Sequence, residues 1–426
     1  MNILVSAFAC HPPTTALSTP KDKKMADGEA ILGWNLVQEI SRRHRVCVVT
    51  QERNREGIER AIETGRFNGV EFRFLGLPFW PEFLFNNQIT LHLNYYLWQI
   101  MAYFLAARLN RELPFDFCHH VTFANYWMPS FIGAYLPVSF IWGPMGGGQR
   151  IPEAFLGEYD GRTRAQETIR GVSQWIGTHL LISRKRCLRR AKAILVCNQE
   201  TKDRIPARFR SKVRFFPVNG ISESDLKPER AAVLPDRPFI VLTTGRLVHW
   251  KNFSAAIKAF SDFSHRCPET RFKVIGDGPE KARLQELAEK AGVPDRIQFI
   301  PWLTRDELLR EIRSSHVFLY PSLREGGGAV VVEAMASGVP VIALDIAGPG
   351  FHVQDAWGIK IEPRDPDFII HEMSAALERL YLDGVLREGM GAKARERAAE
   401  YYRWDKLGDR MERIYQASCL KDPDSL

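Results

Sequence analysis

The sequence lacks any run of about 18 consecutive apolar residues, the length that a membrane-spanning helix needs. Its seven cysteines are scattered and odd in number, and no Cys-x-x-Cys pair occurs. Neither a zinc site nor a disulfide framework is therefore indicated, and a reducing cytosol is the simplest compartment. No basic segment precedes the apolar residues Asn2–Ala9, so we interpret them as a buried strand rather than a signal peptide.

Two motifs are also missing. The pair Gly276-x-Gly278 lacks the third glycine of a dinucleotide-binding fingerprint, which argues against a nicotinamide-dependent dehydrogenase. The net charge of +8 indicates an anionic ligand such as a nucleotide-sugar, an anionic lipid or a nucleic acid. No RNA- or DNA-binding motif accompanies that charge, so we expect no nucleic-acid partner.

What the chain does contain is a repeated alternation of short apolar runs and helical periodicity. Strand, helix and strand patterns follow one another over residues 1–75 and again from residue 239 to residue 344. Among the expected strands are one near Val70–Leu75 and two over Phe215–Val218 and Ile297–Ile300. This order is typical of α/β folds with parallel sheets, and 426 residues suffice for two such lobes. The polar stretch Ser222–Asp236 is interpreted as the linker. We therefore predict lobes over 1–222 and 237–400, followed by a final segment over 401–426.

The segment Val317–Gly348 carries the strongest chemical signal. A strand over Val317–Tyr320 is followed by Glu325, three glycines and a helix that contains Glu333. The glycines allow backbone N–H groups to approach a ligand closely, and the start of the helix favours negative charge. A carboxylate accepts two hydrogen bonds side by side, which suits neighbouring sugar hydroxyls. The segment therefore predicts a ligand that carries both phosphate and sugar.

The spacing Glu325-x7-Glu333, ending in Glu-Ala-Met-Ala-x-Gly-x-Pro-Val-Ile, resembles the nucleotide-sugar signature of retaining glycosyltransferases of the GT-B fold, family four. The resemblance implies that Glu325 lies beside the donor sugar and that Glu333 holds the ribose. Gly-Arg-Leu-x3-Lys, with Arg246 and Lys251, resembles the second signature, whose cations grip the diphosphate. Two fixed cations would offset the charge that a departing diphosphate gains.

The resemblance extends to further positions. It implies that Ile300 and Trp302 cradle the nucleobase and that Gly28 approaches the donor phosphates or the acceptor. The complete set expected to bind the donor is Gly28, Gly245, Gly276, Gly278, Ile300, Trp302, Gly326, Gly327, Gly328, Ala329, Val330 and Glu333.

Two histidines complete the candidate catalytic residues. The phrase HHVTFANYWMPS, followed by PVSFIWGPMGGG, resembles a subgroup associated with bacterial surface polysaccharides. In the wider family a histidine at this point contacts the donor sugar, which makes His119 and His120 candidates. Neighbouring residues of a strand point to opposite faces, so which of the two faces the cleft stays open.

Together these patterns predict a retaining hexosyltransferase with two Rossmann-like lobes facing across a cleft and a C-terminal helix that crosses back to the first lobe. The donor would be a nucleoside-diphosphate sugar, and the acceptor a saccharide or lipid-linked saccharide in polysaccharide biosynthesis. No cofactor or metal is expected, because Asp365-Pro366-Asp367 and Asp422-Pro423-Asp424 do not follow strands. The alternatives are a sugar-nucleotide epimerase of the same fold and a non-catalytic nucleotide-sugar-binding protein.

The aromatic and apolar segment Phe79–Leu109 predicts one or two helices that cover the core. Its alternative is a peripheral contact with an anionic membrane at the inner face of the cell membrane. A basic cluster could support such a contact, and its members are Arg184, Lys185, Arg186, Arg189, Arg190 and Lys192.

Overall fold

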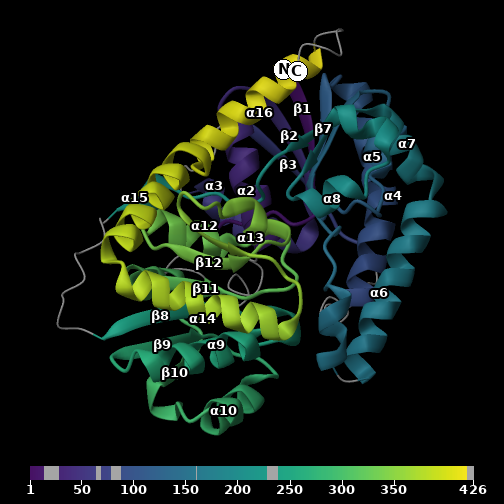
Figure 1. Ribbon diagram of the computed structural model, residues 1–426. Coiled ribbons are helices and arrows are strands. Elements are labelled where there is room, and N and C mark those ends of the chain that lie inside the picture. Colours follow the sequence, from purple (N-terminus) through teal and green to yellow (C-terminus); the bar gives the residue numbers. More distant parts are fainter. Residues whose placement is uncertain (14–27, 64–68, 78–87, 160, 228–237, 420–426) are drawn as a thin grey trace. The chain divides into compact units, whose positions relative to one another are not determined.

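The computed structural model describes residues 1–13, 28–63, 69–77, 88–159, 161–227 and 238–419 (Figure 1). The chain forms two compact units. Unit 1 comprises Met1–Gly148, Ile169–Val218 and Trp404–Leu426, and unit 2 comprises Gln149–Thr168 and Asn219–Arg403. Within the described ranges, none of the helices is both long enough and apolar enough to cross a bilayer.

Unit 1 is built on a parallel sheet of seven strands in the order β3-β2-β1-β4-β5-β6-β7. The strands are β1 (Asn2–Ala7), β2 (Arg45–Gln51), β3 (Val70–Leu75), β4 (Phe117–Thr122), β5 (Ser139–Met145), β6 (Ala191–Val196) and β7 (Val213–Phe215). The helices are α2 (Gly28–Ser41), α3 (Arg55–Glu63), α4 (Gln88–Glu112), α5 (Phe131–Tyr135), α7 (Ile182–Arg190), α8 (Gln199–Asp203) and α16 (Trp404–Cys419). Helix α6 (Gly161–His179) begins in unit 2 and continues into unit 1.

Alternation along the strands gives this sheet two apolar faces. Ile3 and Val5 of β1 pack in one cluster with residues of α2, α3 and α16, whereas Leu4 packs in the other with residues of α4, α5 and α7. This is the two-residue side-chain period expected of a strand that is buried on both sides. Because α16 packs on unit 1, the predicted return of the C-terminal helix to the first lobe is confirmed.

Unit 2 contains a parallel six-stranded sheet in the order β10-β9-β8-β11-β12-β13. The strands are β8 (Phe239–Thr244), β9 (Thr270–Ile275), β10 (Ile297–Ile300), β11 (Val317–Tyr320), β12 (Val341–Leu344) and β13 (Gly358–Ile361). The helices are α9 (Phe253–Arg266), α10 (Lys281–Lys290), α11 (Arg305–Arg313), α12 (Ala329–Ala336), α13 (Ala347–His352), α14 (Pro366–Leu382) and α15 (Gly384–Tyr401). The two Rossmann-like lobes predicted from the sequence are thus both present.

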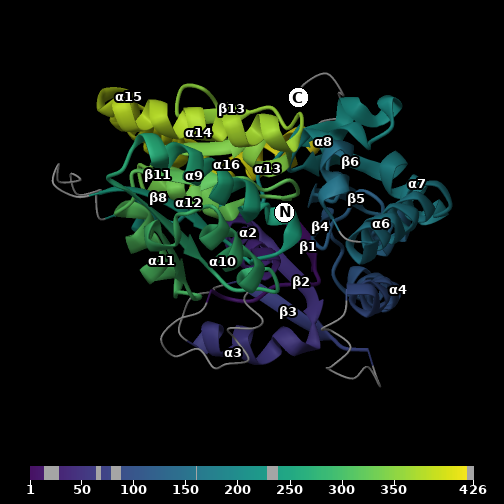
Figure 2. The same cartoon turned by 60° about the horizontal axis from the view of Figure 1, so that its bottom comes forward.

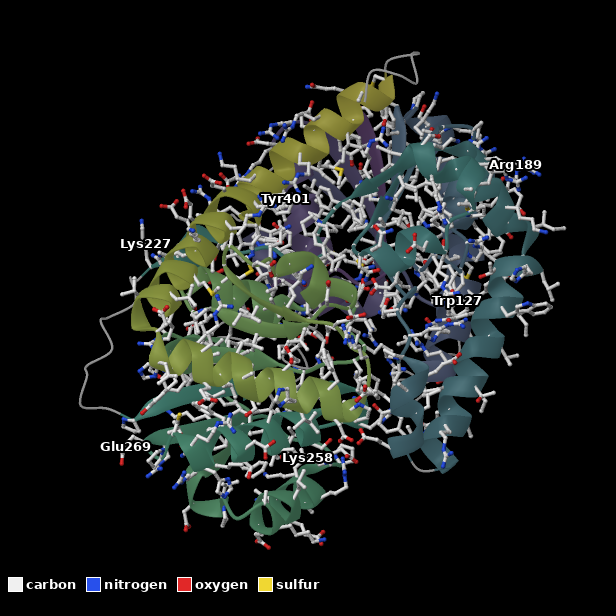
Figure 3. All side chains as sticks on the ribbon, in the orientation of Figure 1. Trp127, Arg189, Lys227, Lys258, Glu269 and Tyr401 are labelled. Carbon is white, nitrogen blue, oxygen red and sulfur yellow. The ribbon has the colours of Figure 1, made fainter. Side chains whose placement is uncertain are left out.

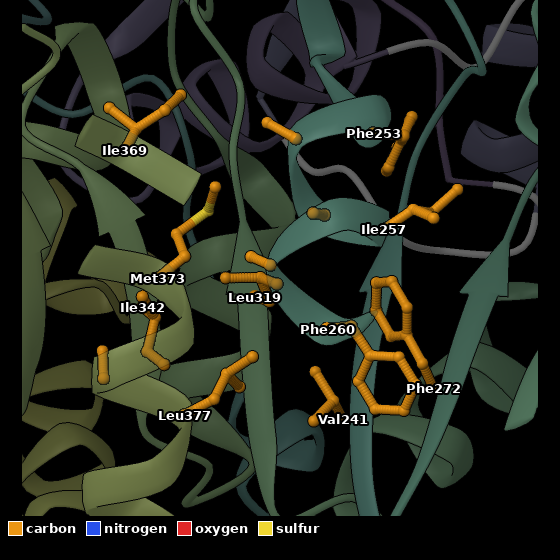
Figure 4. Packing of buried hydrophobic residues seen from close by; sticks show 14 of the residues in the cluster. Val241, Phe253, Ile257, Phe260, Phe272, Leu319, Ile342, Ile369, Met373 and Leu377 are labelled. Atoms are coloured by element: carbon orange, nitrogen blue, oxygen red, sulfur yellow. The ribbon is translucent and has the colours of Figure 1, made fainter. Parts of the chain in front are cut away.

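The core of unit 2 has the same two-sided construction. On one face, Val241 and Leu319 of the sheet pack against α9 and α14, as Figure 4 shows for Phe260 and Leu377 among others. On the other face, Phe318 packs in a cluster with residues of α12 and α15. Both faces are therefore buried, which holds the ends of β8 and β11, and the loops that follow them, in fixed positions.

The structure differs from the sequence-based expectations in several segments. The strand expected over Phe215–Val218 is wrong, because β7 ends at Phe215. The expected linker is ordered in part, since Ser222 caps a 3₁₀ turn over Glu223–Leu226 in which Asp225 is buried. Residues 228–236 of that linker, and residues 79–87 of the apolar segment, lie outside the described residues. From Gln88 onward that segment is α4, and it covers the core as predicted.

The segment Gln149–Thr168 belongs to unit 2, although the first lobe was expected to continue to residue 222. Its apolar side chains explain this assignment, because Ile151 and Phe155 are buried in the cluster formed by α9 and α14. Nothing in the hydrophobic pattern of this short segment distinguishes one core from the other.

Candidate functional site

The Gly-rich loop of unit 2 connects β11 to α12. Gly328 caps α12 with φ of 68°, a left-handed conformation that L side chains rarely adopt. The loop is also crowded from outside: a Cβ on Gly348 would lie 2.6 Å from the carbonyl oxygen of Gly327. The Gly348 N–H donates to the backbone carbonyl of Glu325 at 3.1 Å. Glycine is thus required at two points of this turn.

Three side chains meet where this loop begins. The Lys251 ammonium donates to the Tyr320 hydroxyl at 2.6 Å and forms an ion pair with the Glu325 carboxylate. The Tyr320 hydroxyl in turn donates to Glu325 Oε2 at 2.9 Å. We call Lys251, Tyr320 and Glu325 the loop triad. Lys251 and Glu325 come from the two separate signatures, so the structure brings together two residues that are 74 positions apart in the sequence.

The loop triad keeps Glu325 ionised. Burial alone would raise the pKa of this carboxyl group, but the Lys251 charge and hydrogen bonds from Lys251, Tyr320 and the Gly328 N–H lower it below its ordinary value. A fixed negative charge therefore lies beside the start of α12. Two donors of the Lys251 ammonium are occupied by Tyr320 and Glu325, and a third remains for a ligand.

The loop after β8 supplies the other candidate cation. Arg246 is exposed, and among the described residues it makes no hydrogen bond or ion pair. Its neighbour Gly245 lies against the Lys251 side chain, since a Cβ there would be 3.7 Å from the Lys251 Cε. A cation in this setting is available for an anionic ligand.

The glycines after β9 have a packing role that the sequence did not reveal. A Cβ on Gly276 would lie 2.0 Å from the Gly245 carbonyl oxygen, and one on Gly278 would lie 2.3 Å from that of Leu247. The loops after β8 and β9 therefore pack backbone against backbone. This contact positions Arg246, whether or not either glycine also touches a ligand.

Glu333 lies in α12 with its own cation. Arg305, at the start of α11, donates to Glu333 Oε1 at 3.0 Å and to Asp225 Oδ1 at 2.7 Å. Burial raises the pKa of the Glu333 carboxyl above its ordinary value, although the charge of Arg305 opposes that shift. Sequence reasoning missed Arg305, because a charged residue in the first turn of a helix carries no special pattern.

The expected nucleobase positions lie at the carboxyl end of β10. The Ile300 carbonyl accepts a hydrogen bond from the Gly276 N–H at 2.8 Å, which ties this strand end to the β9 loop. Trp302 follows it and is 58% exposed, an unusual state for so large an apolar ring. Its indole face is accessible for stacking.

The two candidate histidines lie inside unit 1. The Nε2–H of His119 donates to the Gly143 carbonyl at 2.7 Å, and its Nδ1 pairs with the Tyr415 hydroxyl at 2.7 Å. His120 lies on the opposite face of β4, where Nε2 contacts the Tyr95 hydroxyl at 2.7 Å. Burial lowers their pKa values to about 4 and about 3, so both rings are neutral at pH 7. Both side chains are fully buried, and their expected contact with a donor sugar stays a prediction.

Gly28 is the first residue of α2, and the loop before it lies outside the described residues. No heavy atom lies within 4 Å of where its Cβ would be, so packing does not require glycine there. The next residue, Glu29, accepts a hydrogen bond at 3.1 Å from the backbone N–H of Phe123, whose φ is 55°. This contact fixes the turn after β4, and no sequence pattern indicates it.

A further residue supports the Gly-rich loop from behind. His352 donates through Nε2 to the Gly327 carbonyl at 2.5 Å, while its Nδ1 accepts from the Tyr402 hydroxyl at 2.7 Å. Burial lowers the His352 pKa to about 4, so this arrangement is uncharged and persists at neutral pH.

Of the two Asp-x-Asp motifs, Asp365 caps α14 by accepting from the Phe368 N–H at 2.9 Å. The second motif lies outside the described residues.

Comparison with known proteins agrees with this geometry. Residues 227–397 match the family described as "Glycosyl transferases group 1". This match covers most of unit 2 and includes both signatures.

Among curated proteins, the chain is 28% identical to alpha-D-kanosaminyltransferase from Streptomyces kanamyceticus over 58% of this chain and 64% of that protein. The chain spans about half the length of other curated relatives that it matches.

Solved structures extend the likeness over nearly the whole chain. Sucrose-phosphate synthase from Thermosynechococcus elongatus superposes with a TM-score of 0.60 at 19% identity, covering 97% of this chain and 98% of that one. A protein from Anabaena in complex with UDP gives 0.60 at 14% identity, covering 98% of this chain and 100% of that one. At these identities the likeness establishes the fold, which is the GT-B fold of two Rossmann-like lobes.

Proposed function

We propose that the protein transfers a hexose from a nucleoside-diphosphate sugar to a saccharide or lipid-linked saccharide, with retention of anomeric configuration. The observation that carries the proposal is the loop triad beside the start of α12. It combines an ionised carboxylate, an ammonium with a remaining donor and backbone N–H groups at a helix start. This combination suits a ligand in which sugar and diphosphate are adjacent.

In this proposal the bond from the anomeric carbon to the diphosphate oxygen breaks, and a bond to an acceptor hydroxyl forms on the same face. Lys251 and Arg246 bind the departing diphosphate, whose negative charge grows as the bond breaks. Glu325 accepts hydrogen bonds from the hexose hydroxyls. The proton of the acceptor hydroxyl passes to the departing phosphate, so no separate protein base is needed.

The remaining site residues hold the nucleoside. Glu333 accepts hydrogen bonds from the ribose hydroxyls and is held in place by Arg305, while Trp302 stacks on the base. Since two cations of the protein supply the positive charge, the proposal requires no metal. Turnover should therefore persist after dialysis against a chelator, and complete loss that is restored by a divalent cation would contradict this part.

The test is to incubate the purified protein with nucleoside-diphosphate sugars, with and without oligosaccharide or lipid-linked acceptors. We expect free nucleoside diphosphate only when an acceptor is present, and a product with the donor's anomeric configuration by NMR. An altered sugar that stays attached to its nucleotide without an acceptor would instead indicate an epimerase. Inversion at the anomeric carbon would contradict the retaining reaction.

Two relatives support this proposal, because their names describe sugar transfer. Alpha-D-kanosaminyltransferase is a sugar transferase, and a GDP-mannose-dependent mannosyltransferase from Corynebacterium glutamicum is 27% identical over 48% of this chain. We place the reaction in the cytosol and in polysaccharide biosynthesis.

A further inference from the structure

The outer side of α6 is apolar where solvent-facing helices are usually polar. Exposed apolar residues follow helical spacing at Ile169, Val172 and Ile176, with Trp175 beside them, and Leu180 continues the spacing directly after the helix. Between 43% and 59% of each side chain's reference area is accessible, and Ile182 at the start of α7 reaches 75%. We call these six residues the α6 stripe.

The α6 stripe is not the side by which α6 packs, because the helix contacts unit 1 through its opposite side. Gln174 is buried there, donating to the Gly147 carbonyl at 3.1 Å and accepting from the Tyr126 hydroxyl at 3.3 Å. Gly177 lies against Trp127, since a Cβ would be 2.5 Å from the Trp127 carbonyl oxygen. The helix therefore attaches by polar and small residues and presents its large apolar residues outward, the reverse of an ordinary surface helix.

The segment that contains most of the α6 stripe is strongly basic. From Thr168 to Gln199 the chain contains no aspartate or glutamate, but seven lysines and arginines. Four of the basic cluster are exposed, namely Lys185, Arg186, Arg189 and Lys192. Figure 3 shows Arg189 on the outer side of α7, and Figures 1 and 2 both show α4, α6 and α7 next to one another.

Two members of the basic cluster have a different role. Arg184 is buried and donates to the Tyr126 and Thr178 carbonyls, and Arg190 donates to three backbone carbonyls, including Gly133 at 3.1 Å. These two arginines hold α7 in place, which leaves the four exposed members of the basic cluster for a partner.

We propose that the α6 stripe and these four cations form a docking surface for an anionic lipid bilayer, with α6 lying in the plane of the headgroups. Apolar residues would enter the acyl boundary, Trp175 would sit at headgroup level, and the cations would meet lipid phosphates. A second copy of the chain is a poorer occupant, because a two-fold interface would bring these like charges together. The docking surface is independent of the proposed transfer reaction, although it would bring unit 1 to a lipid-linked acceptor.

The test is co-sedimentation of the full chain with vesicles of phosphatidylcholine alone or mixed with phosphatidylglycerol. We expect the wild type to bind the anionic vesicles, and less so as salt rises, because screening weakens the cationic contribution. The variant Ile169→Gln/Ile176→Gln/Leu180→Gln keeps the net charge and should lower the bound fraction about tenfold or more. The matched control, Leu382→Gln/Val385→Gln, replaces two residues of unit 2 that are 72% and 87% exposed, and should bind as the wild type does.

Three results would overturn the proposal. The first is that the wild type does not bind anionic vesicles, and the second is that the triple variant binds them as well as the wild type does. The third is that the wild type is a dimer that binds no vesicles and the triple variant is a monomer. The substituted side chains are exposed, so the thermal unfolding midpoint should not change and folding does not confound the result. Nucleoside-diphosphate binding measured on the same variants should be unchanged, which separates this proposal from the transfer reaction.

Discussion

Lys251→Met removes the ammonium of the loop triad while keeping the length of the side chain. In the structure this ammonium binds Tyr320 and Glu325 and keeps one donor for a ligand. Losing one preorganised donor to a developing anion costs about 3 kcal/mol of transition-state stabilisation. We therefore expect kcat to fall about a hundredfold or more.

The same change should alter stability in a pH-dependent way. In the wild type the Glu325 pKa is lowered, so the pair stabilises the fold above the ordinary pKa of a glutamate and loses that effect as pH falls through the lowered value. Without Lys251, only the weaker hydrogen bonds oppose the effect of burial on the Glu325 pKa. Burial therefore favours the protonated carboxyl group. The variant should lose about 1–3 kcal/mol at pH 7, since Glu325 is left without its cation, and recover part of this in acid.

A second substitution separates the two effects. Lys251→Met/Glu325→Gln removes the unpaired charge, so it should regain stability at pH 7 without regaining turnover. Lys258→Met is the matched control, because Lys258 is an exposed lysine of α9 (Figure 3) and should leave both quantities unchanged. Steady-state kinetics and urea unfolding measure the two effects. Wild-type kcat and donor KM in Lys251→Met would refute the role of the loop triad.

Further predictions concern the other polar contacts. Tyr320→Phe removes one donor to Glu325 and should slow kcat about tenfold with little loss of stability, so kinetics unchanged from wild type would count against its placement. Arg305→Met removes the cation that holds Glu333. The factor by which the donor KM rises should be about ten times the factor by which kcat falls. An effect on kcat alone would argue against the ribose contact. The lowered pKa values of His119 and His120 predict stability that is complete above about pH 6.5 and declines toward pH 4, as protons bind the unfolded chain first. Urea midpoints across that range test this, and His120→Gln should flatten the slope.

Much of the fold could be predicted because both sheets are buried on two sides. Strands of this kind appear as short apolar runs, and the strands expected near Val70–Leu75 and over Ile297–Ile300 and Val317–Tyr320 are confirmed. The strand near Phe215 was misplaced because β7 is three residues long and lies at the sheet edge, where burial is incomplete. The assignment of Gln149–Thr168 to unit 2 depends on contacts that no local pattern contains.

The candidate site, like the fold, could be predicted from the sequence only in part. The glutamates and cations of the two signatures could be named from spacing, but the residues that hold them could not. Tyr320 looked like the last apolar residue of a strand, and Arg305 like a surface charge at a helix start. His352 contacts Gly327 from 25 residues away, and nothing in the sequence marks it. Side chains that act through tertiary contacts leave no periodic signal, which is why the structure was needed to find them.

In the proposed reaction, the cations after β8 bind the diphosphate of an activated sugar. The most direct measurement is calorimetric titration of the wild type and of Arg246→Ala/Lys251→Met with UDP, GDP, ADP and TDP. We expect at least one of these to bind the wild type, and the double variant to bind it a hundredfold or more weakly, which corresponds to about 3 kcal/mol. Equal affinity in both proteins, or no binding of any nucleoside diphosphate to the wild type, would contradict it.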